Sequence, residues 1–184
     1  GRWIFDHLGK SPVLMSSVNG ETRAKVATNL LHDYGYFNGS VSFQEVPQKN
    51  PKESKVSYII NMAQPYFLDS IAYLKFPHYA DSLIQSTLSQ SVLKGGENFS
   101  VLKLEEERQR LSGLFRNHGY YYYRPEFTTY RADTLQKPGY VNLQVVPRSG
   151  IPAEAKKQYY IGKTSVYLTG YNDEAPTDTL RLRT

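Results

Sequence analysis

The sequence LLHDYGYF at residues 30–37 returns in altered form as LFRNHGYY at residues 114–121. In both stretches, apolar residues at helical spacing lead to a Gly-Tyr pair, and a stretch rich in aromatic residues follows. Glycine can take the left-handed backbone that ends a helix without a Cβ penalty, so Gly35 and Gly119 are predicted to end two helices. Their separation, 119 − 35 = 84 residues, is too long for the short solenoid repeats. The chain is therefore predicted to be a tandem array of small domains.

The first unit reads as a helix followed by a hairpin. Ala27, Leu31 and Tyr34 fall at i, i+4 and i+7, which places them on one face of a helix spanning about residues 21–34. From Tyr36 onward, apolar residues recur at every second position, as in a strand. A second alternating stretch at residues 56–62 follows a polar turn, so the two stretches predict a hairpin. We therefore expect this unit to be the back part of a domain.

The second unit is more complete. Its pattern predicts, in order, a strand at 66–76, a helix at 78–93, a second helix starting after Asn98 or Ser100 and ending at Gly119, and strands at 120–130 and 140–146. After a polar connector at 148–157, residues 159–168 echo residues 66–74 and are predicted to open a third unit. We therefore expect three segments: 1–63, 64–150 and 151–184. The first five residues read as a helix entered midway, so we expect the chain to be part of a longer protein.

Composition and spacing argue against catalysis and metal binding. The absence of cysteine excludes disulfides, thiolate metal sites and cysteine nucleophiles. The four histidines lack ligand spacing, and no phosphate loop or catalytic triad pattern is evident. Glu105, Glu106 and Glu107 diverge around a helix, so we predict a solvated face rather than a site. We expect no enzyme activity and no cofactor. The net charge of +5 is scattered, which also disfavours nucleic acid as a partner.

The element order, with a helix ending in Gly-Tyr before a hairpin, resembles the POTRA (polypeptide-transport-associated) domain. The residues GENFS at 96–100, then Leu104, Leu111, Phe115 and Gly119-Tyr120, resemble the second helix and following strand of that family. The residues GKSPV at 9–13 and DYGYF at 33–37 are similar to periplasmic regions of BamA/TamA-type outer-membrane assembly proteins. Within that group the sequence looks closest to the TamA-like lipoprotein (TamL) branch.

The resemblance implies an α+β fold of tandem βααββ domains, each a three-stranded mixed sheet covered by two helices. It also implies a place on the periplasmic side of the bacterial outer membrane. There the domains would bind unfolded outer-membrane client proteins, or accessory periplasmic or lipoprotein subunits, by β-augmentation. They would deliver them to a covalently continuous outer-membrane β-barrel outside this chain.

In such a sheet the strand after the hairpin turn takes the middle position, here residues 56–62 and 140–146, which leaves its hairpin partner at an edge. An exposed edge offers unpaired N–H and C=O groups to an incoming extended peptide. The predicted edge residues are Gly39, Ser40, Val41, Ser42, Phe43, Gln44, Tyr121, Tyr123 and Phe127. Pro125 should interrupt pairing in the second unit, so we favour residues 39–45 as the docking edge. Gly35, Tyr36, Gly119 and Tyr120 are predicted to be structural.

Three alternatives remain open at this stage. A two-partner secretion transporter would use similar domains for a single dedicated substrate. An extracellular sugar- or peptide-binding module would present several of the 16 tyrosines coplanar and exposed on one face. A structural spacer would have both sheet edges covered.

Overall fold

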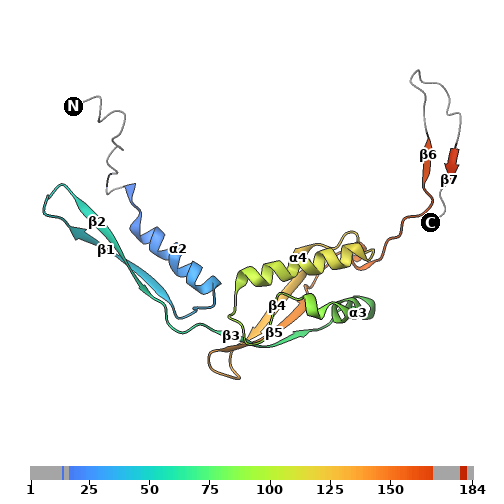
Figure 1. Ribbon diagram of the computed structural model, residues 1–184, viewed down its shortest axis with the longest axis horizontal. Helices are drawn as coiled ribbons and strands as arrows, with labels where there is room; N and C mark the ends of the chain where they lie inside the picture. The colour runs from blue at the N-terminus through green and yellow to red at the C-terminus, as the bar shows by residue number, and fades with distance from the viewer. Residues whose placement is uncertain (1–13, 15–16, 168–178, 182–184) are drawn as a thin grey trace, which may run out of the picture.

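The computed structural model describes residues 14, 17–167 and 179–181. Figure 1 shows a helix with a hairpin, then a three-stranded sheet with two helices, and finally a connector that leads to a short hairpin. None of the helices in the described part of the chain is long and apolar enough to cross a bilayer.

The first unit consists of α2 (Gly20–Asp33), β1 (Ser40–Pro47) and β2 (Ser54–Asn61). Asn19 caps α2, because its side-chain oxygen accepts the Thr22 N–H at 3.1 Å. Gly35 follows the helix with φ +89°, and the next N–H, that of Tyr36, returns to the Leu31 C=O at 2.9 Å. The predicted helix and hairpin are both present. The middle position predicted for residues 56–62 is not found among the described residues, where this sheet consists of β1 and β2 alone.

The second unit has the βααββ order that the sequence predicts. Its elements are β3 (Phe67–Tyr73), α3 (His78–Ser86), η2 (Leu88–Gln90), α4 (Val101–Asn117), η3 (Pro125–Phe127), β4 (Thr128–Asp133) and β5 (Tyr140–Pro147). The strand order is β3-β5-β4, with β3 parallel and β4 antiparallel to β5. The sheet is therefore mixed, and β5 is its middle strand as predicted. The α+β fold class is confirmed.

One buried cluster joins both helices to the sheet. Val141, Leu143 and Val145 alternate along β5 and face Ile84 of α3 and Phe115 of α4, all at most 1% exposed. Burial of this kind stabilises by about 25 cal/mol per Å² of apolar surface. The second unit thus holds the main core of the described chain.

Two predicted boundaries in the second unit were wrong. The first helix ends at Ser86 and gives way to a 3₁₀ turn, so it does not continue to residue 93. The strand predicted from Tyr120 begins instead at Thr128. The Tyr123 N–H closes a turn onto the Tyr120 C=O, and Pro125 has fixed φ and no N–H to give to a ladder.

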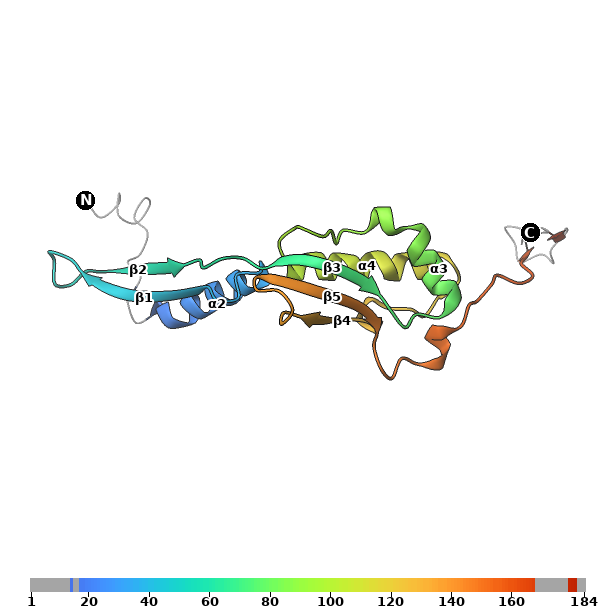
Figure 2. The ribbon, with the colours of Figure 1, turned by 90° about the horizontal axis from the view of Figure 1, so that it is seen from below.

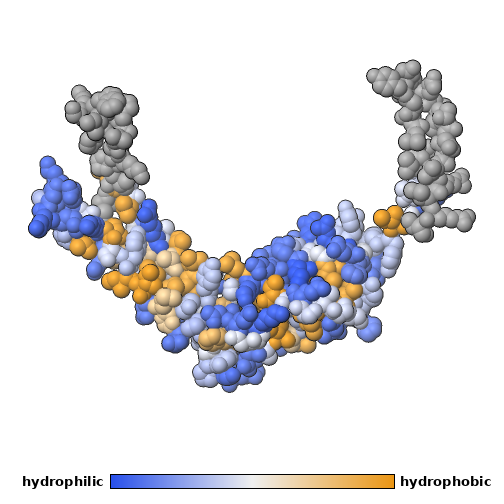
Figure 3. All heavy atoms as spheres, in the orientation of Figure 1, coloured by the Kyte–Doolittle hydropathy of each residue, from blue (hydrophilic) through white to orange (hydrophobic). Residues whose placement is uncertain are grey.

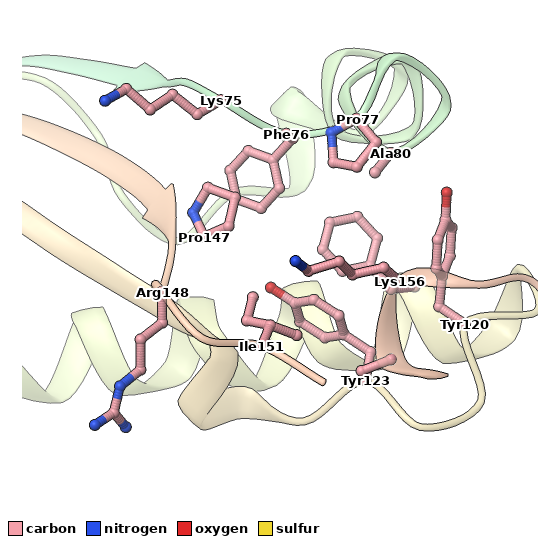
Figure 4. A pocket seen from close by; sticks show the side chains of 12 residues that line it. Lys75, Phe76, Pro77, Ala80, Tyr120, Tyr123, Pro147, Arg148, Ile151 and Lys156 are labelled. Atoms are coloured by element: carbon pink, nitrogen blue, oxygen red, sulfur yellow. The ribbon is translucent and has the colours of Figure 1, made fainter. Parts of the chain in front are cut away.

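The connector after β5 is anchored rather than merely solvated. It forms η4 (Ala153–Lys156), and the buried Ile151 and Ala155 line the same cavity as Phe115, Tyr120 and Tyr123. Figure 4 shows Ile151 beside Tyr123. Beyond it, β6 (Ser165–Tyr167) pairs antiparallel with β7 (Thr179–Arg181). The strand predicted from residue 159 therefore starts six residues later, and residue 168, its last predicted position, lies outside the described residues.

Candidate functional site

The β1–β2 hairpin has two outer edges, and the residues whose backbone groups face outward follow from the register. Ser40 pairs with Asn61 and Phe43 with Tyr58, and the same alternation continues past the strand ends, where the Gln48 N–H bonds the Glu53 C=O at 3.3 Å. In an antiparallel ladder, bonded pairs alternate with pairs whose backbone groups point away from the partner strand. Even-numbered residues of β1 therefore bond to β2, while Val41, Phe43 and Glu45 present their backbone groups outward.

The inner half of the β1 edge is closed by the helix of its own unit. Thr28 of α2 accepts the Val41 N–H on its hydroxyl at 2.9 Å, and His32 Nε2 lies 3.1 Å from the Gly39 C=O. Figure 2 shows α2 running beside this part of β1. Of the predicted docking edge, residues 39–41 are thus already bonded within the unit.

The outer half of β1 is open toward the hairpin turn. The outward N–H and C=O groups of Phe43 and Glu45 have no hydrogen-bond partner among the residues that the structure describes. Ser42 and Gln44, also predicted for the docking edge, point their backbone groups into the hairpin and contribute only their side chains to its surface. The free edge is therefore the stretch 43–45.

Exposed apolar side chains gather beside the other strand of the hairpin. Leu30, Ile60 and Met62 are each at least half exposed, and together with Ala27, Leu31, Tyr34, Tyr36 and Val41 they line a groove of about 290 Å³. Figure 3 shows hydrophobic residues gathered over α2 and the hairpin. In the second unit, β3 and α3 occupy the corresponding places beside β5 and α4. The groove therefore lies where an equivalent strand and helix of the first unit would pack.

The edge in the second unit differs from the predicted one. Tyr121, Tyr123 and Phe127 all precede β4, so their assignment to an edge strand was wrong. Tyr123 is a core residue whose ring packs edge-on against Phe115, with the ring centroids 4.7 Å apart. Burial raises the pKa of Tyr123 to about 12, although its hydrogen bond with Thr128 acts in the opposite direction. Tyr121 is 63% exposed but lies in the turn after Gly119.

The two Gly-Tyr pairs do more than end helices, because each glycine carbonyl holds the chain that enters the next segment. The Gly35 C=O accepts the Tyr66 N–H at 2.9 Å, and the Gly119 C=O accepts the Tyr159 N–H at 2.7 Å. A Cβ on Gly35 would lie 2.6 Å from the Phe99 carbonyl oxygen, and one on Gly119 would lie 2.9 Å from that of Tyr159. Close backbone approach and a positive φ therefore require glycine at both positions.

A buried carboxylate was missed by the sequence reasoning. Glu107 is fully buried, so its assignment to a solvated face was wrong. It accepts the Tyr73 hydroxyl at 2.6 Å and the Val92 N–H at 3.2 Å, and Arg110 binds both its oxygens at 2.6 and 2.9 Å. Burial, followed by the hydrogen bond to Glu107, raises the pKa of Tyr73 to about 12. Each polar atom of the carboxylate is satisfied, so the network ties β3 and the α3–α4 loop to α4.

Two further observations on the described residues concern metal binding and catalysis. Within residues 14, 17–167 and 179–181, no three His, Asp or Glu side chains converge on a point where a metal ion could bind. A cavity of about 210 Å³ between α3, α4 and the connector has an aromatic floor, and Lys75 and Arg148 at its rim point away from it (Figure 4). This cavity presents no nucleophile with an adjacent base.

No known protein family matches the sequence, and neither does any curated protein. Solved structures with a similar fold include two of BamA. The crystal structure of Haemophilus influenzae BamA POTRA3-5 shares 12% identity over 71% of this chain and 50% of that chain, with a TM-score of 0.44. The structure of BamA from Haemophilus ducreyi lacking POTRA domains 1-3 shares 14% identity over 76% of this chain and 24% of that chain, with a TM-score of 0.47. The chain thus spans half of the first structure's length and about a quarter of the second's.

Proposed function

We propose that this chain is a tandem POTRA-like region on the periplasmic side of the bacterial outer membrane, belonging to an assembly or translocation factor of the BamA/TamA type, in its TamL branch. It binds unfolded outer-membrane client polypeptides or accessory subunits and passes them to a membrane β-barrel. The proposal rests on the sequence resemblance, on the βααββ order of the second unit, and above all on one observation. That observation is the free outer half of β1, where Phe43 and Glu45 offer unpaired backbone groups.

The client strand pairs with β1 rather than with β2. The outer side of β2 corresponds to the place that β3 holds beside β5, so we assign it to a strand of the first unit itself. At β1, the N–H and C=O groups of two residues offer up to four backbone hydrogen bonds. Each contributes about 0.5–1.5 kcal/mol net, which gives weak and sequence-tolerant binding. Such binding suits a domain that must also release its clients.

Two alternatives have less support. A sugar-stacking platform needs coplanar aromatic rings, but the exposed tyrosines lie nearly perpendicular to one another: 85° between Tyr121 and Tyr122, and 83° between Tyr122 and Tyr159. A pure spacer needs both edges covered, whereas the outer half of β1 is open.

The test uses a pair of proline substitutions one residue apart. Glu45→Pro removes an outward N–H and leaves the hairpin ladder intact, whereas Gln44→Pro removes an N–H that bonds to β2. Photo-crosslinking of an unfolded outer-membrane client from a probe at Phe43 should be lost in Glu45→Pro while the circular dichroism of the chain stays unchanged. Gln44→Pro should instead disturb the hairpin itself. Full crosslinking in a folded Glu45→Pro chain contradicts the β1 assignment.

A further inference from the structure

The junction between the first and second units is a closed, three-part contact. The Gly35 C=O accepts the Tyr66 N–H, and the Tyr66 C=O in turn accepts the Phe99 N–H at 2.8 Å. The Phe37 ring completes it, with its centroid 5.1 Å from that of Tyr66 and 5.1 Å from that of Phe99. Phe99 directly precedes Ser100, the N-cap position of α4, and is only 7% exposed. An aromatic residue at the start of a helix thus packs against the Gly-Tyr turn of the preceding unit.

Part of the same contact is present at Gly119. The Gly119 C=O accepts the Tyr159 N–H, which repeats the bond between Gly35 and Tyr66. The Tyr120 N–H returns to the Phe115 C=O at 3.0 Å, just as the Tyr36 N–H returns to Leu31. Gln158 strengthens this second junction by donating its side-chain amide to the His118 C=O at 2.9 Å.

The contact that Phe99 makes at the first junction has no equivalent among the described residues at Gly119. No described residue donates a hydrogen bond to the Tyr159 C=O. The equivalent carbonyl at the first junction, that of Tyr66, accepts the Phe99 N–H. The side chains around it are left uncovered: Tyr121 is 63% exposed, and Tyr160 and Ile161 are 80% and 85% exposed. Ile161 corresponds in sequence to Leu68, which is 1% exposed. These side chains and Tyr79 line an open groove beside Gly119.

We propose that this groove is a socket for an aromatic residue at the start of a helix in an adjoining unit of the same polypeptide. The aromatic ring fills the space between Tyr121 and Ile161, and its backbone N–H donates to the Tyr159 C=O. The filled junction at Gly35 is the template for this contact, and it supplies both the geometry and the chemistry of the occupant. The inference concerns how the units are joined, and it does not depend on client binding at β1.

The experiment places a photo-crosslinking benzoylphenylalanine at Tyr121 in the full-length protein, with the same probe at Phe37 and at Leu135 as controls. The Phe37 probe should crosslink to the segment around Phe99, and the probe at Leu135, which is 92% exposed, reports background. The Tyr121 probe should crosslink within the same polypeptide, to a helix-start segment containing an aromatic residue. Replacing that residue with alanine should lower the yield to the Leu135 level.

Two results would overturn the inference. One is a crosslink from Tyr121 to a different protein. The other is a Tyr121 yield no higher than that of Leu135 while the Phe37 probe still reports Phe99. Because neither readout requires a client, failure here leaves the β1 assignment untouched.

Discussion

The two units place equivalent residues in opposite environments. Leu31 and Phe115 both lie four residues before a Gly-Tyr glycine, yet Phe115 is 1% exposed, whereas Leu31 is only half-buried and lines an open groove. In the second unit the rings of Phe76, Tyr120 and Tyr123 pack against Phe115, whereas no described element closes the groove at Leu31 in the first. The same helix-and-hairpin motif therefore gives a stable core when it is covered, and an exposed apolar surface with a free strand edge when it is not.

The largest expected effect is a difference in stability between these two positions. Phe115→Ala should destabilise the second unit by about 3–5 kcal/mol, because it leaves a cavity in a close-packed core. Leu31→Ala should cost the first unit about 1 kcal/mol or less, because its side chain already lies at an open groove. Urea unfolding followed through the NMR signals of each unit measures both. Equal losses would mean that the first unit is covered in solution.

The buried carboxylate provides the next comparison, within one helix. Glu107→Ala should cost about 3–5 kcal/mol, since it leaves Arg110 without its buried partner. Glu105→Ala, on the exposed side of α4, should change stability by less than about 0.5 kcal/mol. Thermal unfolding of the two variants checks the contrast. Recovery of most of the loss in a Glu107→Leu/Arg110→Leu double variant would confirm that the cost arises from the unpaired charge.

Gly35→Ala should have a smaller effect that is confined to the junction. The positive φ costs about 1–2 kcal/mol for a residue with a Cβ, and the new methyl group also meets the Phe99 carbonyl. Gly139→Ala is the matched control, because Gly139 has φ +77° and no atom within 4 Å of the added Cβ. NMR relaxation should show the two units tumbling more independently in Gly35→Ala only. Identical relaxation in both variants would rule out the Gly35 carbonyl as the coupling contact.

The smallest effect under ordinary conditions is alkaline destabilisation of the second unit. The pKa values of Tyr73 and Tyr123 are raised from 10.0 to about 12 mainly by burial, and that of Tyr130 is raised as well. As the pH rises, these tyrosines therefore ionise first in the unfolded chain. Their contribution to the free energy of unfolding is complete below pH 10 and is lost as the pH rises from about 10 to 12. The urea concentration at the midpoint of unfolding should fall across this pH range, and it should fall less in Tyr73→Phe. A flat profile would contradict the burial of these hydroxyls.

Much of the fold follows from local sequence patterns. The Gly-Tyr pairs mark both helix ends, and the alternation of Val141, Leu143 and Val145 identifies the middle strand, because these signals act within a few residues. Glu107 could not be placed in this way. Its burial depends on Tyr73, Val92 and Arg110, two of which belong to segments far away in the sequence.

The candidate site was predictable only in part. The alternation at residues 40–45 identifies an edge strand, but the closure of Val41 requires Thr28 to face it across the helix–strand packing. The aromatic run from Tyr120 reads as a strand by composition, yet the turn at Tyr120–Tyr123 and the proline at 125 override that preference. Tertiary contacts and backbone constraints, rather than propensity, decided both outcomes.

Amide hydrogen exchange along β1, measured with and without an unfolded outer-membrane β-strand peptide, tests the proposed docking edge most directly. Without the peptide, Ser42 and Gln44 should exchange slowly, because they are bonded to β2, while Phe43 and Glu45 should exchange fast. The peptide should slow exchange at Phe43 and Glu45 and leave Ser42 and Gln44 unchanged. Fast exchange at Phe43 and Glu45 with saturating peptide, or protection that appears only along β4, would contradict the assignment of β1 as the client-binding edge.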